Sequence, residues 1–163
     1  MASSLTPDAG PEAADIQAQR LSQSIARLRR AMRRAARAAD PANTLTVAQL
    51  ELLAALAEHQ GMRPGELARL LHLAPNTVTT LINALAPRGL ISRSPADNDR
   101  RAVAMRLTES GESAVRGWQA TNTAILAAAV PALPAAQRRA LAKAGPALDA
   151  LARAIDELAD AAG

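Results

Sequence analysis

Residues 63–108 decide the fold, and their sequence is RPGELARLLHLAPNTVTTLINALAPRGLISRSPADNDRRAVAMRLT. The stretch opens with Pro64, which suits a first helical position because proline lacks the N–H group that would be unsatisfied there. Glu66 follows, where a carboxylate is favoured by the positive end of the helix dipole. The pattern predicts a short helix from residue 64 and a turn at residues 72–74.

A second helix is expected at residues 75–86, PNTVTTLINALA, because Pro75 again suits a first helical position. Its apolar residues recur at helical spacing and predict an inward face made of Val78, Leu81, Ile82 and Leu85. The other face carries small polar side chains, namely Asn76, Thr77, Thr79, Thr80 and Asn83. Such side chains can hydrogen-bond phosphates and base edges or touch a thymine methyl group. This pattern is typical of a DNA recognition helix.

Two short apolar runs, residues 90–92 and 102–107, follow Pro87 and Gly89, which end the second helix. The second run alternates apolar residues with smaller or charged ones, which predicts a strand with one buried face formed by Val103, Met105 and Leu107. We therefore expect a hairpin around the loop RSPADNDRR. Arginines in a loop beside a recognition helix are attracted to the DNA minor groove. The helices and hairpin together predict a winged helix-turn-helix.

Several separated motifs agree in order and spacing with one family. They are Leu67-Ala68, Asn76-Thr77-Val78-Thr79, Arg88-Gly89-Leu90-Ile91, Asp97-x-Asp99-Arg100-Arg101 and Leu107-Thr108-x-x-Gly111. With these motifs the chain resembles the MarR family of bacterial transcription regulators. The resemblance is strongest from residue 46 to residue 111, and the flanking helices fit the plan of that family in kind.

The resemblance implies a homodimer whose two recognition helices enter successive major grooves of a pseudo-palindromic operator. It matches Arg101 to the wing-tip arginine that enters the minor groove, and it gives Asp97, Asp99 and Arg100 the role of shaping the loop. Taken with the polar face of the second helix, the expected DNA-binding residues are Pro75, Asn76, Thr77, Thr79, Thr80, Asn83, Arg88, Arg93, Asp99, Arg100 and Arg101.

The sequence departs from the family pattern in the recognition helix. Many relatives have an arginine at the position of Thr80, and an aspartate that can pair with a wing arginine at the position of Asn83. Without a guanidinium group at Thr80 the bidentate guanine contact is lost there, so we expect an A·T-rich operator read by shape and methyl contacts. Ala74 replaces a capping serine, which leaves Asn76 or water to satisfy the first helical amides.

Helices are also expected on both sides of the winged unit, so the predicted fold is mainly α with a small β-wing, in one domain at residues 15–163. The tail 1–14 is expected to be disordered, and the winged helix-turn-helix occupies 46–107. The N-terminal helix should run from about Asp15 to Ala39, and a capping box at Thr46 opens the next helix. The segments 15–45 and 108–163 are expected to form the dimerisation region.

The C-terminal region should contain two helices. The first is capped by Thr108 and extends to about Ala129, and the second begins at Ala135. Gly145-Pro146 is expected to kink or split this last helix. At the other end of the winged unit, Met62-Arg63 is a candidate for a third short strand against the hairpin.

Composition narrows the function. The net charge is +4, and residues 61–107 alone carry seven arginines against three acidic residues, which is also +4. The chain has no cysteine, which excludes disulfides, thiolate metal sites and thiol-based sensing. A signal peptide and a membrane span are not predicted, so we expect a soluble cytoplasmic protein. Seven arginines on the first helix are more simply explained by a solvated face than by a second anion-binding surface.

Catalysis, cofactors and metal binding are not expected. Flanking arginines neutralise Asp97 and Asp99, and no third ligand stands near them in the sequence. His59 and His72 are better explained as solvated or capping residues than as zinc ligands or pH sensors. Trp118 is expected in core or junction packing. A nucleophile elbow and a phosphate-binding loop are both missing from the sequence.

Three functions remain open at this point. The favoured one is a homodimeric DNA-binding transcription regulator, a repressor released by a small ligand. The resemblance implies a small apolar or aromatic anion as this effector, of unknown identity. The second is a winged-helix dimer that binds DNA without an effector, in a constitutive or architectural role. The third is a winged-helix module for protein contacts, which alone predicts no salt-dependent affinity for DNA.

Overall fold

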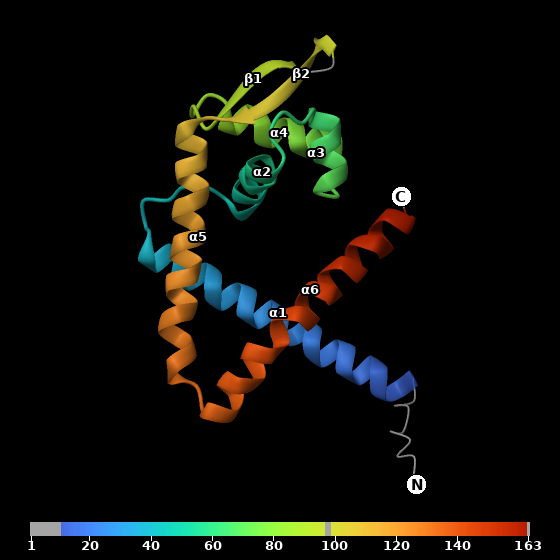
Figure 1. Ribbon diagram of the computed structural model, residues 1–163, viewed down its shortest axis with the longest axis vertical. Helices are drawn as coiled ribbons and strands as arrows, with labels where there is room; N and C mark the ends of the chain where they lie inside the picture. The colour runs from blue at the N-terminus through green and yellow to red at the C-terminus, as the bar shows by residue number, and fades with distance from the viewer. Residues whose placement is uncertain (1–10, 97–98, 163) are drawn as a thin grey trace. The chain divides into compact units, whose positions relative to one another are not determined.

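The computed structural model describes residues 11–96 and 99–162 of the chain (Figure 1). The chain divides at residue 41 into two units, each with its own elements. The first unit contains helix α1 (Pro11–Ala39). The second contains α2 (Val47–Glu58), α3 (Pro64–Leu70), α4 (Pro75–Leu85), β1 (Ile91–Ala96), β2 (Asp99–Leu107), α5 (Glu109–Ala129), the short 3-10 helix η1 (Val130–Ala132) and α6 (Ala135–Ala162). The chain is therefore mainly helical with a small two-stranded sheet, as predicted.

Helix α1 begins at Pro11, four residues before the expected start at Asp15. Proline is favoured in a first turn and the alanines that follow have high helix propensity, so the helix extends into the expected tail. The expectation of disorder is wrong for residues 11–14, and residues 1–10 lie outside the described residues. Helix α1 leaves three large apolar side chains exposed, since Leu21, Ile25 and Leu28 are 40 %, 39 % and 57 % exposed.

Helix α2 forms the centre of the core of the second unit. Its capping box is present, since Thr46 Oγ1 accepts from the Gln49 amide at 3.3 Å and Gln49 Oε1 accepts from the Thr46 amide at 2.9 Å. Its buried residues are not confined to one stripe, since Leu50, Leu52, Leu53 and Leu56 are buried while Val47 is exposed. The reason is that α3, α4, α5 and β2 all contact α2, so that most of its circumference is covered.

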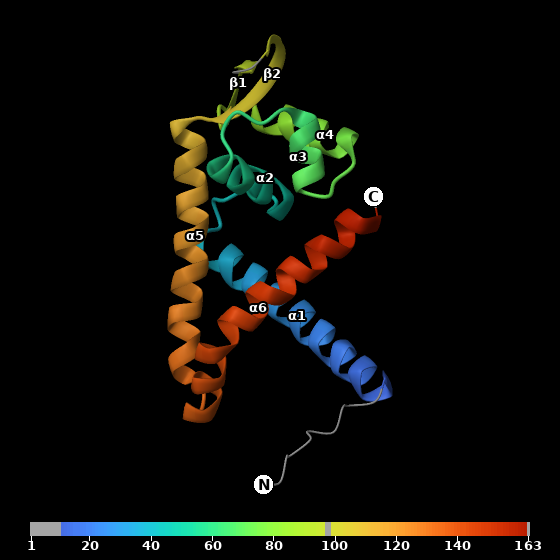
Figure 2. The ribbon, with the colours of Figure 1, turned by 45° about the vertical axis from the view of Figure 1, so that its right-hand side comes forward.

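The helix-turn-helix consists of α3 and α4, which pack against each other and against α2, on the same side of α5 as the hairpin (Figures 1 and 2). Glu66 accepts a hydrogen bond from the Arg63 amide at 2.7 Å in the first turn of α3. His72 has a φ of 49° in the turn before Pro75 opens α4. Val78, Ile82 and Leu85 are buried, as the helical spacing predicts. The turn and the core thus fix the face that α4 presents outward.

The hairpin pairs β1 and β2 antiparallel, from Ile91 opposite Leu107 to Pro95 opposite Val103. Its strands are longer than expected. Most of the predicted loop at residues 93–101 is strand, since polar side chains on a ladder can point to solvent and Pro95 is tolerated on an edge strand. Residues 97–98, including Asp97, lie outside the described residues.

The buried face of β2 also differs from the expected one. Met105 and Leu107 are buried as predicted, but Val103 is 49 % exposed and Ala104 is buried. Val103 lies nearer the tip, where the hairpin projects beyond the helices (Figure 1). The predicted third strand is reduced to an isolated bridge, in which the Met105 amide donates to the Met62 carbonyl at 2.8 Å.

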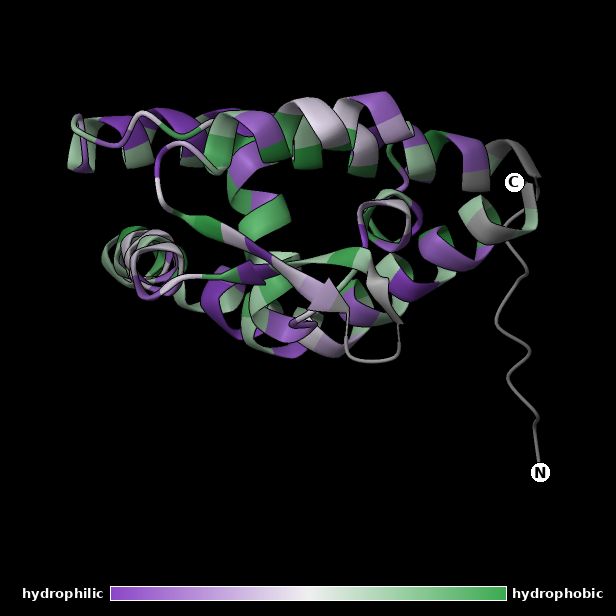
Figure 3. Ribbon diagram, turned by 90° about the horizontal axis from the view of Figure 1, so that it is seen from above, coloured by the Kyte–Doolittle hydropathy of each residue, from purple (hydrophilic) through white to green (hydrophobic). Residues whose placement is uncertain are grey.

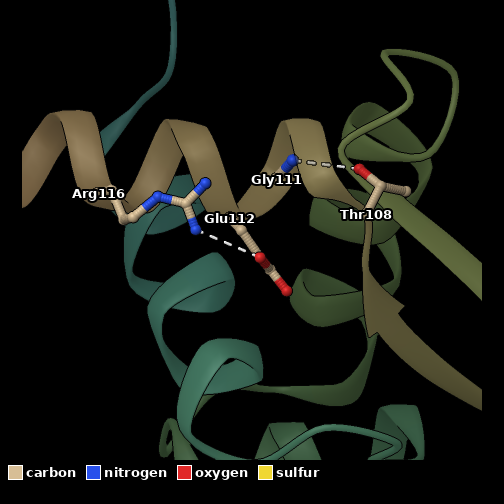
Figure 4. Close-up of polar contacts among 4 residues, drawn as sticks. All are labelled: Thr108, Gly111, Glu112 and Arg116. Carbon is tan, nitrogen blue, oxygen red and sulfur yellow. Dashed lines mark hydrogen bonds and ion pairs between the residues drawn. The ribbon is translucent and has the colours of Figure 1, made fainter.

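Helix α5 begins at its predicted cap. Thr108 Oγ1 accepts from the Gly111 amide at 3.1 Å, and Arg116 pairs with Glu112 at 3.2 Å one turn further on (Figure 4). Trp118 is half-buried on this helix, which ends at Ala129 as expected.

Helix α6 runs through Pro146 as one helix, so the expected split at Gly145-Pro146 is wrong. A continuous helix keeps the apolar residues before and after the proline on one stripe, namely Leu141, Leu148, Leu151, Ile155 and Leu158. Figure 3 shows polar and apolar residues alternating along the helical ribbons. None of the helices within residues 11–96 and 99–162 is long and apolar enough to cross a membrane.

Candidate nucleic-acid interface

The outward face of α4 carries a polar stripe made of Asn76, Thr79, Thr80 and Asn83, and all four residues are exposed. Their spacing of three, four and seven residues places them on one side of the helix, opposite the buried face. Pro75 and Thr77, the other predicted contact residues of the helix, are exposed near its N-terminus. The structure thus brings the predicted residues of the recognition helix together on one accessible surface.

The N-terminus of α4 lacks a side-chain cap at Ala74. Asn76 compensates in part, because its Oδ1 accepts a hydrogen bond from the Thr77 amide at 2.8 Å. Of the two expected partners for the first helical amides, Asn76 or water, Asn76 thus serves one amide. It also fixes the orientation of the Asn76 carboxamide on the stripe.

The two threonines of the stripe bond to their own helix. Thr79 Oγ1 donates to the Pro75 carbonyl and Thr80 Oγ1 donates to the Asn76 carbonyl, each at 2.9 Å. A hydroxyl group has one donor and two acceptor lone pairs, so in these positions each oxygen has only acceptor capacity left. Each side chain also keeps its methyl group.

Asn83 joins the recognition helix to the wing. Its Oδ1 accepts a hydrogen bond from Nη2 of Arg93, which lies on β1, at 3.0 Å. Asn83 stands where the resemblance implies an aspartate that can pair with a wing arginine, and here an amide oxygen accepts from the guanidinium instead. Arg93 was placed in a loop, so no pattern in the sequence indicated that it would reach Asn83.

Arg88, just beyond α4, contacts a different part of the winged unit. Its Nη2 donates to Oγ1 of Thr44 at 2.8 Å, in the segment that precedes α2. At the base of the hairpin, Arg106 Nε donates to Ser94 Oγ at 3.2 Å across the two strands. Thr44 and Ser94 were not among the predicted residues, since their roles depend on contacts between segments distant in sequence.

The wing residues expected at the minor groove are only partly placed. Asp99, Arg100 and Arg101 belong to β2, but the described part of the structure does not include their side chains, and Asp97 lies outside it altogether. Their DNA contacts therefore remain predictions. Their backbone position at the far end of the hairpin from α5 is the one that the wing assignment requires.

Groups suited to catalysis or metal binding do not gather within the described residues. No cluster of three or more His, Cys, Asp or Glu residues occurs there, and no polar or charged side chain is buried there. His59 follows the end of α2 as its C-cap and His72 lies in the turn before α4, and both are exposed. Exposed amides, hydroxyls and arginines beside a rigid helix are suited to binding a polyanion with readable edges.

Comparison with known sequences identifies one family. The profile of the MarR family matches residues 45–103. An uncharacterised HTH-type transcriptional regulator of Mycobacterium bovis is 31 % identical over 137 residues, which covers 84 % of this chain and 91 % of that protein. The HTH-type transcriptional repressor MdtR of Bacillus subtilis is 32 % identical over 83 residues, which covers 51 % of this chain and 54 % of MdtR.

Solved structures agree with this match. A crystal structure of a protein from Pseudomonas aeruginosa has a TM-score of 0.72 and 31 % sequence identity, and the match covers 85 % of this chain and 96 % of that one. A MarR family protein from Bacillus stearothermophilus shares the fold, with a TM-score of 0.69 at 20 % identity, over 86 % of this chain and 96 % of that one.

Proposed function

Because the chain belongs to the MarR family of DNA-binding transcriptional regulators, we propose that it is a repressor that binds a pseudo-palindromic operator as a homodimer. As a member of this family it is a regulator and not an enzyme. The observation that carries the proposal is the exposed polar stripe of α4, joined to the wing by Arg93 and Asn83. The repressor role is supported by the relative MdtR, which is named a repressor.

The homodimer is supported by apolar faces that the single chain leaves exposed. Helix α6 exposes about half or more of Leu141, Leu148, Ile155 and Leu158, and α1 exposes Leu21, Ile25 and Leu28. Large exposed apolar faces on amphipathic helices mark protein interfaces. A second copy related by a two-fold axis would bury such faces and place two copies of α4 about 10 base pairs apart, in successive major grooves.

In the proposed complex the stripe of α4 reads base edges, and Arg88 and Arg93 contact phosphates. Arg101, at the far end of β2, is inserted into the minor groove, and its neighbours Asp99 and Arg100 hold the wing tip in shape. Arginines are attracted to a narrow minor groove because its potential is strongly negative. A protein that regulates genes works where the DNA lies, so we propose a cytoplasmic location.

We further propose that a small apolar or aromatic anion releases the operator. The support is the family resemblance, and any such ligand must bind the released arrangement more tightly than the DNA-bound one. Benzoate is a suitable first probe because it combines an aromatic ring with a carboxylate. If benzoate and related carboxylates leave the operator affinity unchanged, the alternative of DNA binding without an effector is favoured.

The test is binding of the purified full chain to duplex DNA from upstream of its own gene and neighbouring genes, at two salt concentrations. We expect tight binding that weakens steeply with salt, because phosphate contacts release counterions. Arg101→Ala should weaken it about tenfold or more, since Arg101 loses both charge and groove contact. Arg139→Ala on α6 is the matched control and should bind like the wild type. Equal, weak binding of all three proteins to any duplex would overturn the proposal.

A further inference from the structure

The polar stripe of α4 has a fixed hydrogen-bonding character. The hydroxyl groups of Thr79 and Thr80 donate their only hydrogen atoms to the Pro75 and Asn76 carbonyl groups, respectively. The two threonines therefore offer acceptors and methyl groups. A threonine bonded in this way cannot donate to a guanine or thymine oxygen without breaking a helical contact, so hydrogen-bond donors on the stripe must come from elsewhere.

The donors come from the two asparagines. Oδ1 of Asn76 accepts from the Thr77 amide and Oδ1 of Asn83 accepts from Arg93, at 2.8 Å and 3.0 Å respectively. A carboxamide oxygen has two lone pairs, but the one that remains on Asn83 lies beside a guanidinium cation. That positive charge disfavours the approach of a second donor. Asn83 is thus oriented to act outward through its Nδ2 N–H groups.

This orientation bears on which base Asn83 can read. The familiar asparagine contact with adenine needs both groups, because Oδ1 accepts from N6 while Nδ2 donates to N7. Because Asn83 Oδ1 already accepts from Arg93, the hydrogen bond from adenine N6 to Oδ1 is disfavoured. The major-groove acceptors open to Nδ2 are N7 of adenine and guanine, O6 of guanine and O4 of thymine. In adenine, N7 lies beside the N6 donor, which the Oδ1 already paired with Arg93 is poorly placed to accept. Thymine alone adds a methyl group next to its acceptor.

Thr80 supplies the complementary methyl group. It lies three residues before Asn83 on the same exposed face of α4, so the two side chains are neighbours. The Thr80 hydroxyl bonds back to the helix, and its methyl group is the apolar part that remains. One thymine edge presents O4 and the C5 methyl group side by side, which matches the pair formed by Asn83 and Thr80.

We propose that α4 reads a thymine in each half-site, with Asn83 Nδ2 donating to O4 and the Thr80 methyl group packing on the C5 methyl. Arg93 acts as a positioning residue, because it holds Asn83 in the orientation that disfavours adenine. This inference rests on the proposed function, in which α4 is the recognition helix. It goes further by naming the base, the contacting atoms and the residue that sets the preference.

The first test selects operator sequences from random duplexes with the full chain and then measures the affinity for each base at each position. Asn83→Asp can still accept from Arg93 but has no donor, so the preference for thymine at one position should fall about tenfold. Arg93→Met releases Oδ1 of Asn83, so adenine should approach parity with thymine at that same position. Arg88→Ala is the matched control, because it removes an arginine that contacts Thr44 and not the stripe. It should lower the affinity for all duplex sequences by the same factor.

The second test replaces that thymine by uracil, which keeps O4 and lacks the methyl group. We expect the wild type and Thr80→Val to lose several-fold in affinity, and Thr80→Ser, which has no methyl group, to be insensitive. A selected guanine at this position, or equal binding of thymine and uracil by the wild type, would overturn the inference while leaving operator binding intact. Failure to bind any duplex in a salt-sensitive manner would instead overturn the proposed function, and the inference with it.

Discussion

Gly111 near the start of α5 is packed so closely that it leaves no room for a side chain. A Cβ atom there would overlap the carbonyl oxygen of Leu90 and lie 3.0 Å from the side chain of Leu107. Gly111→Ala should therefore force a backbone shift and lower the free energy of unfolding by about 1–3 kcal/mol, even after the gain in helix propensity. Urea unfolding followed by circular dichroism measures the change.

Gly117 provides the matched control, since it lies in the same helix and a Cβ atom added to it would have no heavy atom within 4 Å. Gly117→Ala should raise the free energy of unfolding by about 0.5–1 kcal/mol, because alanine loses less backbone entropy in a helix. If Gly111→Ala were as stable as the wild type, the close approach of α5 to Leu90 would be wrong.

At the level of single residues, the sequence predicted roles that depend on neighbours in the chain. The Thr46 capping box, the Thr108 cap and the contact of Asn76 with its own helix all follow from spacings of a few residues. Contacts such as that between Arg93 and Asn83 depend on where a strand runs beside a helix. Short-range patterns carry no information on that placement, so such contacts could not be predicted.

The hairpin shows the same distinction at the level of an element. Alternation predicted a strand at residues 102–107, but it did not predict that β2 continues to Asp99 or that the burial of its apolar face ends before Val103. The strand extends because charged residues are compatible with the ladder of a two-stranded hairpin, in which both strands are edges. Burial ends there because the hairpin extends beyond the helices that cover its base. The position at which the cover ends depends on the tertiary structure and not on the local sequence.

Two substitutions on β2 test where this limit lies. Met105 is 1 % exposed and bridges to Met62, so Met105→Ala should cost about 2–5 kcal/mol of unfolding free energy through the cavity it leaves. Val103→Ala, two residues along on the same strand, should cost about 1 kcal/mol or less. Urea unfolding of both variants gives the comparison. Equal costs would show that the core extends further along the hairpin than the structure has it.

For the whole molecule, the sequence predicted each long helix but could not show what covers its apolar stripe. An amphipathic pattern identifies a face that needs a partner without naming the partner. In α2 the partners are α3, α4, α5 and β2 of the same chain, whereas Leu148 and Ile155 on α6 remain 51 % and 54 % exposed. The proposed homodimer assigns a second copy to this face, and that assignment can be tested directly.

Leu148→Glu combined with Ile155→Glu places two charges on the apolar stripe of α6. Burying them in an interface would cost several kcal/mol without partners, so we expect the dimer to dissociate, as measured by sedimentation. Operator affinity should fall at least tenfold, because one recognition helix then binds without its partner. Ala142→Glu adds a glutamate on the polar side of the same helix and should remain dimeric. A double variant that stays dimeric would show that this face is not the interface, and the proposed pairing of half-sites would need another origin.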